Sequence, residues 1–188
     1  PPDAPARPHI YAMSGHLGVD PYRWLENPDD PETIAYLEAE TAYAEAVMAP
    51  TSVLQEALYG ELTGRIQQAD ASVPTPWNGY LYYVRFEEGR DYELICRRRG
   101  GMDAPEEILL DLNAIAGDFL TLKMWLPSPD NRFLAYNIDE TGEEYFTTYV
   151  RDLQRGETID RIPVSWDFQW ANDNRTLFYA RQHPERVW

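Results

Sequence analysis

The chain has 188 residues, of which 44% are hydrophobic and 26% are charged, a composition ordinary for a globular protein. Its formal net charge of −16 argues against nucleic acid and against an anionic membrane surface as partners, because both require a basic face. The amino-terminal residues lack the apolar core of a signal peptide, and no run of about 18 apolar residues that could span a membrane is present.

Cys96 is the single cysteine, so no disulfide forms within the chain, and we expect a reducing, cytoplasmic compartment. Its neighbours favour a buried strand thiol. A catalytic thiol would need a histidine partner, and none of His9, His16 and His183 stands in a motif with it. Paired zinc ligands and glycine-rich phosphate or dinucleotide motifs are also missing, so we expect no metal and no cofactor.

The first segment, residues 1–28, is predicted to be irregular because it is rich in proline, which blocks long helices. Within it, the run 20–26 is a short apolar anchor. We expect Tyr22, Trp24 and Leu25 to be buried against another part of the protein.

Two helices are predicted next. The first has Asp30 as its N-cap and Pro31 in its first turn, and it ends at Pro50. The second begins at Ser52, with Gln55 completing a capping box, and ends near Gln68. The apolar positions recur at helical spacing, and a Glu61–Arg65 pair adds support: Ile34, Leu37, Thr41, Ala44 and Val47, then Leu54, Leu58, Leu62 and Ile66.

From residue 73 onward, short strands alternate with turns, and Glu88-Gly89-Arg90 is a hairpin signal. The predicted strands are Tyr80–Phe86, Tyr92–Arg99, Glu106–Leu112, Phe133–Ile138 and Glu144–Leu153.

An internal repeat predicts the architecture. Residues 127–136 (PSPDNRFLAY) match residues 170–179 (WANDNRTLFY) at five positions, with a constant offset of 43. A period of about 40–50 residues with short strands is typical of a β-propeller. Leu134 and Leu177 would then pack between adjacent blades. Gly79–Tyr83 is a weaker match to this repeat and lacks the Asp-Asn turn.

We therefore predict a helical extension over residues 1–72, followed by the first two to three blades of an incomplete β-propeller over residues 73–188. A propeller needs roughly four to eight blades to close, and an unclosed edge invites aggregation. We expect the chain to be a fragment or to be completed by another polypeptide.

The same segments resemble the prolyl oligopeptidase family of serine peptidases, most closely its oligopeptidase B branch. The resemblance spans nearly the whole chain in family order. Its motifs are DPYRWLEN (20–27), YLEAETAYAEAVMA (36–49), GYLYYVRFEEGRDYELICRR (79–98), EEILLDLNAIA (106–116), SPDNRFLAYNIDETGEEYFTTYVRDL (128–153) and WANDNRTLFYARQHP (170–184).

The resemblance implies a helical extension that packs on an α/β-hydrolase domain, and a seven-bladed propeller that admits only short peptides. It also implies cleavage after Lys and Arg, so that the partners are short basic peptides and the missing propeller and hydrolase portions. The extension's expected contact surface with the hydrolase is Tyr22, Trp24, Leu25 and the apolar stripe of the second helix.

No catalytic residue can be assigned. The nucleophile of this fold lies in a G-x-S-x-G turn, and none of the serines has glycine on both sides at that spacing: Ser14, Ser52, Ser72, Ser128 and Ser165. In the family the triad lies near the carboxyl terminus. We expect this chain alone to be inactive.

A few charged loops remain as weaker candidates. An acidic hairpin tip could face the propeller tunnel and attract basic peptides, but a solvated turn is the simpler and favoured explanation. Asp118 could face a domain interface, and His183-Pro184 resembles a blade-edge loop. The tip comprises Glu87, Glu88, Asp91 and Glu93.

Three functional hypotheses follow. The leading one is the architectural front part of a serine oligopeptidase. The second is a non-catalytic propeller that serves as an interaction module, which the blade repeat supports but the entry motif and helices do not. The third is a truncated pseudo-enzyme that assembles with a separately supplied remainder.

Overall fold

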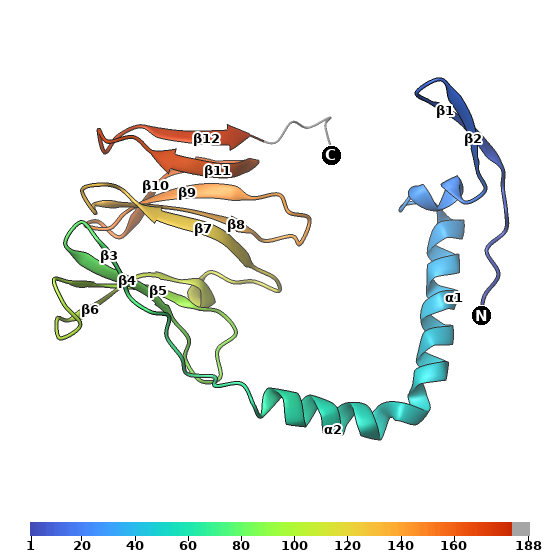
Figure 1. The fold of residues 1–188 in the computed structure, drawn as a ribbon, viewed down its shortest axis with the longest axis horizontal. Coiled ribbons are helices and arrows are strands. Elements are labelled where there is room, and N and C mark those ends of the chain that lie inside the picture. The colour runs from blue at the N-terminus through green and yellow to red at the C-terminus, as the bar shows by residue number, and fades with distance from the viewer. Residues whose placement is uncertain (182–188) are drawn as a thin grey trace. The chain divides into compact units, whose positions relative to one another are not determined.

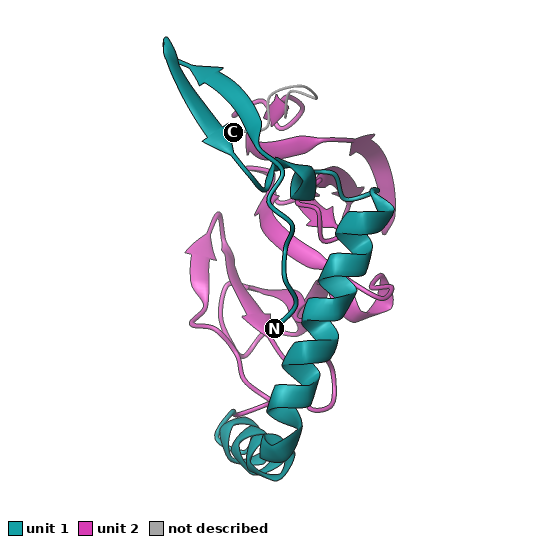
Figure 2. Ribbon diagram, turned by 90° about the vertical axis from the view of Figure 1, so that its right-hand side faces the viewer, with its two compact units in different colours: residues 1–66 teal, residues 67–188 magenta. Residues whose placement is uncertain are grey.

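The computed structural model describes residues 1–181. The chain divides into two compact units: unit 1 is Pro1–Ile66, and unit 2 begins at Gln67 (Figure 2). Unit 1 contains a hairpin and two α-helices, whereas unit 2 is built of β-strands.

Unit 1 begins with a β-hairpin, so the prediction that residues 1–28 are irregular was wrong. Strands β1 (His9–Met13) and β2 (His16–Asp20) pair antiparallel. Ser14 and Gly15 connect them with positive φ angles of 53° and 80°, which is the backbone twist that a two-residue hairpin turn requires. The prolines lie before and after the hairpin, where they do not interrupt strand pairing.

The helices of unit 1 follow the short 3-10 segment η1 (Arg23–Glu26). They are α1 (Pro31–Met48) and α2 (Ser52–Thr63), joined by the 3-10 turn η2 (Ala49–Thr51). Asp30 caps α1 as predicted, because its carboxylate accepts a hydrogen bond from the Glu32 amide at 2.8 Å.

Helix α2 begins at Ser52, as predicted, but its cap and its end differ from the prediction. Its N-cap is Thr51, and the Gln55 side-chain amide donates to the Thr51 hydroxyl at 2.7 Å. It ends at Thr63, well before Gln68, because Gly64 serves as the C-cap. The predicted Glu61–Arg65 ion pair is present.

The anchor run is organised within unit 1. The Trp24 indole donates to the Pro5 carbonyl at 3.0 Å, its ring lies edge-on to Tyr36 at 5.9 Å, and the Arg7 guanidinium lies 4.8 Å from it. Trp24 and Leu25 are half-buried. Tyr22 is exposed within unit 1, and its burial against a hydrolase domain stays a prediction.

Unit 2 consists of antiparallel sheets whose strands follow one another in chain order (Figure 1). This arrangement confirms a partial propeller with a helical extension. The first blade consists of β3 (Thr75–Trp77), β4 (Tyr80–Arg85), β5 (Leu94–Arg99) and β6 (Glu106–Asp111). The second consists of β7 (Thr121–Pro127), β8 (Phe133–Asp139), β9 (Thr147–Asp152) and β10 (Glu157–Ile162), and η3 (Leu112–Ala114) connects the two blades. Strands β11 (Ser165–Trp170) and β12 (Leu177–Arg181) follow.

Two strand boundaries differ from the prediction by more than one residue. Strand β5 begins at Leu94 and not at Tyr92, whose amide instead donates to the Asn113 side chain at 3.0 Å. Strand β9 begins at Thr147, because residues 140–146 form a loop in which Gly142 and Glu144 have positive φ.

The sequence repeat corresponds to a turn that recurs in the structure. Asn131 and Asn174 both have a φ of 61°. The Asp130 carboxylate accepts from the Arg132 amide at 3.1 Å, and the Asp173 carboxylate accepts from the Arg175 amide at 2.9 Å. Both sequences therefore form the same turn, in which a short polar side chain bonds to its own backbone.

The segment Gly79–Tyr83 is also preceded by such a turn, although it lacks the Asp-Asn sequence. Asn78 and Gly79 have positive φ angles, and the Asn78 side chain donates to the Pro129 carbonyl at 2.7 Å. In return, the Asn131 side-chain amide donates to the Asn78 carbonyl at 2.9 Å. These bonds join the turns of the two blades.

The core of unit 2 lies between blades. Leu134 is fully buried and packs with Tyr82, Ile95 and Leu110 of the first blade. Leu177 packs against a second cluster between β8 and β11 that includes Trp170. Both leucines occupy the positions that the repeat predicted.

Candidate functional site

The loops of unit 2 gather at two rims, because consecutive antiparallel strands place alternate connections at opposite ends. We call the rim with the first-to-second and third-to-fourth strand turns the turn rim, and the opposite one the loop rim. The turn rim contains residues 78–79, 100–105, 128–132, 153–156 and 171–176, and the loop rim contains residues 86–93, 112–120, 140–146 and 163–164.

Charge is distributed unequally between these rims. The connections of the loop rim carry eight carboxylates and one arginine, whereas those of the turn rim carry three of each. The loop rim therefore has the stronger negative field. Its charged residues are Glu87, Glu88, Arg90, Asp91, Glu93, Asp118, Glu140, Glu143 and Glu144.

The structure thus brings the predicted acidic hairpin tip and Asp118 to one rim. Not all of these charges are available to a ligand. Glu87 is paired with Arg85 at 2.7 Å and with Arg90 at 3.1 Å. The exposed carboxylates of the rim are those of Glu88, Asp91, Asp118, Glu140, Glu143 and Glu144.

The loop of residues 140–146 is held by Asp139, which is almost fully buried. Its carboxylate accepts hydrogen bonds from the Thr141 amide and hydroxyl at 2.8 and 2.7 Å and from the Glu144 amide at 2.8 Å. Burial alone would raise the pKa of Asp139, but these hydrogen bonds outweigh it and lower the pKa. The loop that carries Glu140, Glu143 and Glu144 is therefore held by a carboxylate that is ionised at neutral pH.

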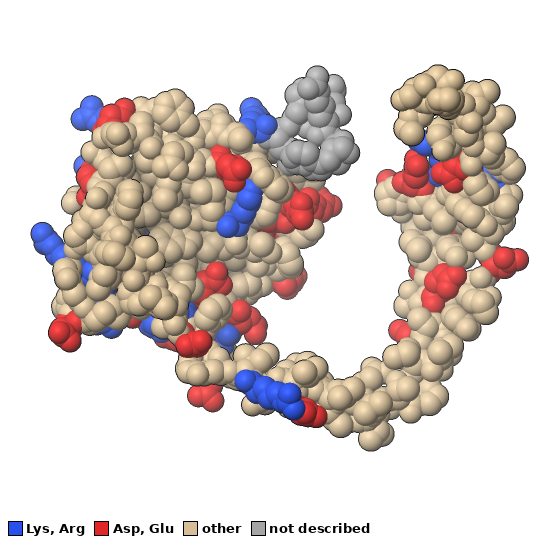
Figure 3. All heavy atoms as spheres, in the orientation of Figure 1, with Lys and Arg blue, Asp and Glu red and all other residues tan. Residues whose placement is uncertain are grey.

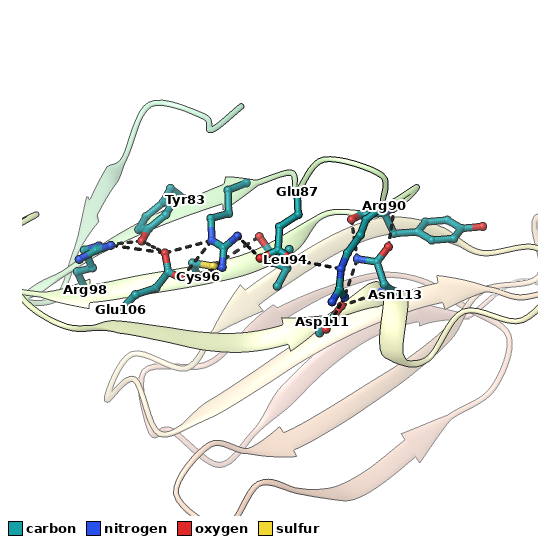
Figure 4. Close-up of polar contacts among 11 residues, drawn as sticks. Tyr83, Glu87, Arg90, Leu94, Cys96, Arg98, Glu106, Asp111 and Asn113 are labelled. Carbon is teal, nitrogen blue, oxygen red and sulfur yellow. Dashed lines mark hydrogen bonds and ion pairs between the residues drawn. The ribbon is translucent and has the colours of Figure 1, made fainter. Parts of the chain in front are cut away.

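A polar network covers the face of the first blade that lies opposite its packed core (Figure 4). The Tyr83 hydroxyl donates to Glu106 at 2.5 Å, and Arg85 donates to the same carboxylate at 2.9 Å. Arg98 donates to the Tyr83 oxygen at 2.8 Å. Burial would raise the pKa of Glu106, but its bonds with Tyr83 and Arg85 lower it.

Cys96 lies within this blade and has no exposed surface. Burial raises its pKa to about 11, so the thiol stays protonated at neutral pH and is a poor nucleophile. The expectation of a buried strand thiol is confirmed.

Three of the serines form hydrogen bonds that stabilise the fold. Ser128 donates to Asp130 at 2.6 Å, Ser165 bonds to Thr148 at 2.5 Å, and Ser72 accepts from the Val84 amide at 2.9 Å. Within residues 1–181, no serine bonds to a histidine, and no three potential ligands converge on a metal position. His183 and Pro184 lie outside the described residues.

No helix among the described residues is long and apolar enough to cross a membrane.

Sequence comparison places the chain in a family. Residues 2–188 match the family described as prolyl oligopeptidase, N-terminal beta-propeller domain. The chain is 37% identical to dipeptidyl aminopeptidase BI of Pseudoxanthomonas mexicana and 30% identical to Protease 2 of Moraxella lacunata. In both alignments 100% of this chain is covered but only 29% of the relative, so the chain spans less than a third of these relatives' length.

Solved structures agree in fold. Oligopeptidase B from Leishmania major superposes with a TM-score of 0.85 at 26% identity, over 97% of this chain and 29% of that one. Oligopeptidase B from Trypanosoma brucei, with covalently bound antipain, gives a TM-score of 0.83 at 28% identity, over 96% of this chain and 28% of that one. The chain belongs to the prolyl oligopeptidase family, as its N-terminal β-propeller domain.

Proposed function

We propose that this chain is the front part of a serine oligopeptidase similar to oligopeptidase B, which hydrolyses short peptides after Lys or Arg. Its own role is architectural: it begins the propeller that limits substrate size and supplies unit 1 as a contact surface for a hydrolase domain. The family match and the fold shared with two oligopeptidase B structures support this proposal.

The observation that carries the substrate class is the acidic loop rim. The chain enters the first blade at this rim, since the Phe86 amide donates to the Asp70 carbonyl and the Ser72 amide donates to the Val84 carbonyl, both at 2.8 Å. A field of one sign concentrates ligands of the opposite charge and accelerates their association. Peptides that contain Lys or Arg carry positive charge, so this rim would attract them.

Unit 1 supports the architectural role. The apolar stripe of α2 is exposed, with Leu54, Leu58 and Leu62 each about half accessible or more. Along α1, the visible surface is either uncharged or acidic (Figure 3). Exposed apolar faces of this extent mark contact sites, and we assign them to the hydrolase domain.

A charge-removal experiment on the full-length enzyme tests the substrate class. We expect the triple variant Glu140→Gln, Glu143→Gln, Glu144→Gln to lower kcat/KM for a peptide with several arginines by about three- to tenfold at low salt, and to leave a peptide with one arginine nearly unchanged. Salt should reduce the difference, since it screens exposed charges.

The matched control is the variant Asp103→Asn, Glu157→Asn, Asp160→Asn, which removes three exposed carboxylates away from the loop rim. An equal loss in both triple variants would assign the effect to net charge and not to the rim. An active enzyme with the same kcat/KM for peptides with one and with several arginines would contradict the proposal.

A second candidate is a dipeptidyl aminopeptidase, because the relative of that name has the higher identity, 37%. Such an enzyme requires a free substrate amino terminus. Acetylation of a short arginine peptide separates the two: an oligopeptidase still cleaves it, whereas a dipeptidyl aminopeptidase does not.

We also propose a cytoplasmic location. The single cysteine is buried and unpaired, which fits a reducing compartment. Fractionation of cells with an antibody against unit 2 would test it, and recovery from the extracellular fraction would contradict it.

A further inference from the structure

An apolar pocket of about 320 Å³ lies on the seam between the first two blades. Trp77 from β3, Tyr82 from β4 and Trp125 from β7 are among its lining residues. The Tyr82 and Trp125 ring centroids are 6.0 Å apart. The volume falls within the range of small-ligand pockets, which typically start at about 300 Å³.

The pocket offers a ligand rings and aliphatic carbons but few free polar groups. The Tyr82 hydroxyl donates to the Asn131 side chain at 2.8 Å, and the Tyr83 hydroxyl donates to Glu106. The Ser72 hydroxyl accepts from the Val84 amide. No charged side chain is part of the lining. An uncharged, apolar group is therefore the ligand that suits it, because a buried charge would find no partner.

The pocket is formed where the leading strands of successive blades come together. β3, β7 and β11 are the first strands of their sheets, and Lys123 on β7 forms an ion pair with Asp167 on β11 at 3.1 Å. Leading strands that converge in this way surround the central channel of a propeller. Trp77, on the first of these strands, is 47% exposed.

We propose that this pocket is a subsite for an apolar, preferably aromatic, side chain of a peptide held in the propeller channel. The inference rests on the proposed peptidase function, which brings peptides into that channel. A phenylalanine side chain can stack on Trp77 and Trp125 in the offset or edge-on arrangements that aromatic rings favour. Such a subsite would select peptides by a residue distant from the cleaved bond.

The test uses the full-length enzyme and octapeptides that contain one arginine in an alanine background, with phenylalanine placed at each other position in turn. We expect phenylalanine at one or two positions to lower KM by about three- to tenfold. Trp77→Ala should abolish that gain, measured as the ratio of the KM values of the all-alanine and phenylalanine peptides within the same variant, and Trp77→Phe should retain most of it.

Phe178→Ala is the matched control, since Phe178 is an exposed aromatic residue outside the pocket. A phenylalanine gain that survives Trp77→Ala, or that Phe178→Ala removes equally, would overturn the subsite. Cleavage of the all-alanine peptide without any phenylalanine gain would overturn it too and leave the peptidase function intact. Absence of all cleavage would overturn the proposed function and the subsite together.

Discussion

The two units of this chain differ in where their apolar side chains lie. In unit 2, leucine, isoleucine and aromatic side chains from both blades form clusters that are almost completely buried. In unit 1, Thr33 is the one buried residue, and Ile10, Leu17 and Leu62 are each more than 60% exposed. Unit 2 therefore has its own core, whereas unit 1 needs an additional surface to bury its apolar faces.

The β1–β2 hairpin makes the contrast sharper. Ile10 pairs with Val19 and Ala12 pairs with Leu17, so one face of the hairpin is entirely apolar. An isolated two-stranded hairpin is marginally stable in water. This face is a second surface, besides α2, through which unit 1 would contact the hydrolase domain that we propose.

The largest expected difference between the units comes from leucine truncation. Leu134→Ala should lower the free energy of unfolding by about 2–5 kcal/mol, because it leaves a cavity between the blades. Leu58→Ala on α2 should change it by less than about 0.5 kcal/mol in the 188-residue chain, since Leu58 is 48% exposed. Urea denaturation followed by tryptophan fluorescence measures both; equal effects would contradict the contrast.

A smaller effect is expected at the turn that joins the blades. Asn131→Ala should cost about 1–3 kcal/mol, because Tyr82 and Asn78 lose buried hydrogen bonds and alanine is strained at this positive φ. Asn131→Gly keeps the backbone conformation and loses only the hydrogen bonds. It should therefore be less destabilising than alanine, and the reverse order would show that the φ angle is unimportant there.

The polar network on the first blade should contribute less. Glu106→Gln should cost about 1–2 kcal/mol, between the values typical of exposed and of buried ion pairs, because Arg85 keeps Glu87 as a partner. Cys96 reports on the same blade: iodoacetamide should label it slowly in the folded chain and faster in the variant. Unchanged labelling and stability would show that the network is dispensable.

The smallest expected effect is a pH dependence of stability at the turn of residues 171–176. Hydrogen bonds from Thr176 and from the Arg175 amide lower the pKa of Asp173 to about 2, from an ordinary value of 3.8. Its contribution to stability is therefore present above about pH 4 and is lost as the pH falls toward 2. Asp173→Asn should flatten the decline in unfolding free energy between pH 4 and 2, and an identical acid profile would contradict this assignment.

The propeller could be predicted because the sequence pattern that specifies it is local and periodic. Asp130 and Asp173 recur with the same turn chemistry, and Leu134 and Leu177 follow at the same spacing. The β1–β2 hairpin was missed although Ser14-Gly15 between alternating residues is a turn signal. Asn78-Gly79 was missed in the same way, although Asn-Gly is a strong hairpin signal.

The candidate sites were harder to predict. The acidic rim depends on which loops share an end of the sheets, and this follows from strand order and not from the sequence of any one loop. The pocket combines Trp77 with Trp125, which are distant in the sequence.

Hydrogen exchange of the 188-residue chain and of the full-length protein tests the central claim, that unit 2 has its own core while unit 1 is completed by a hydrolase domain. We predict that amides of β4, β5, β8 and β9 are protected in both proteins. Amides of α1 and α2 should exchange rapidly in the 188-residue chain and become protected in the full-length protein. Equal protection of α1 and α2 in the two proteins would contradict the account.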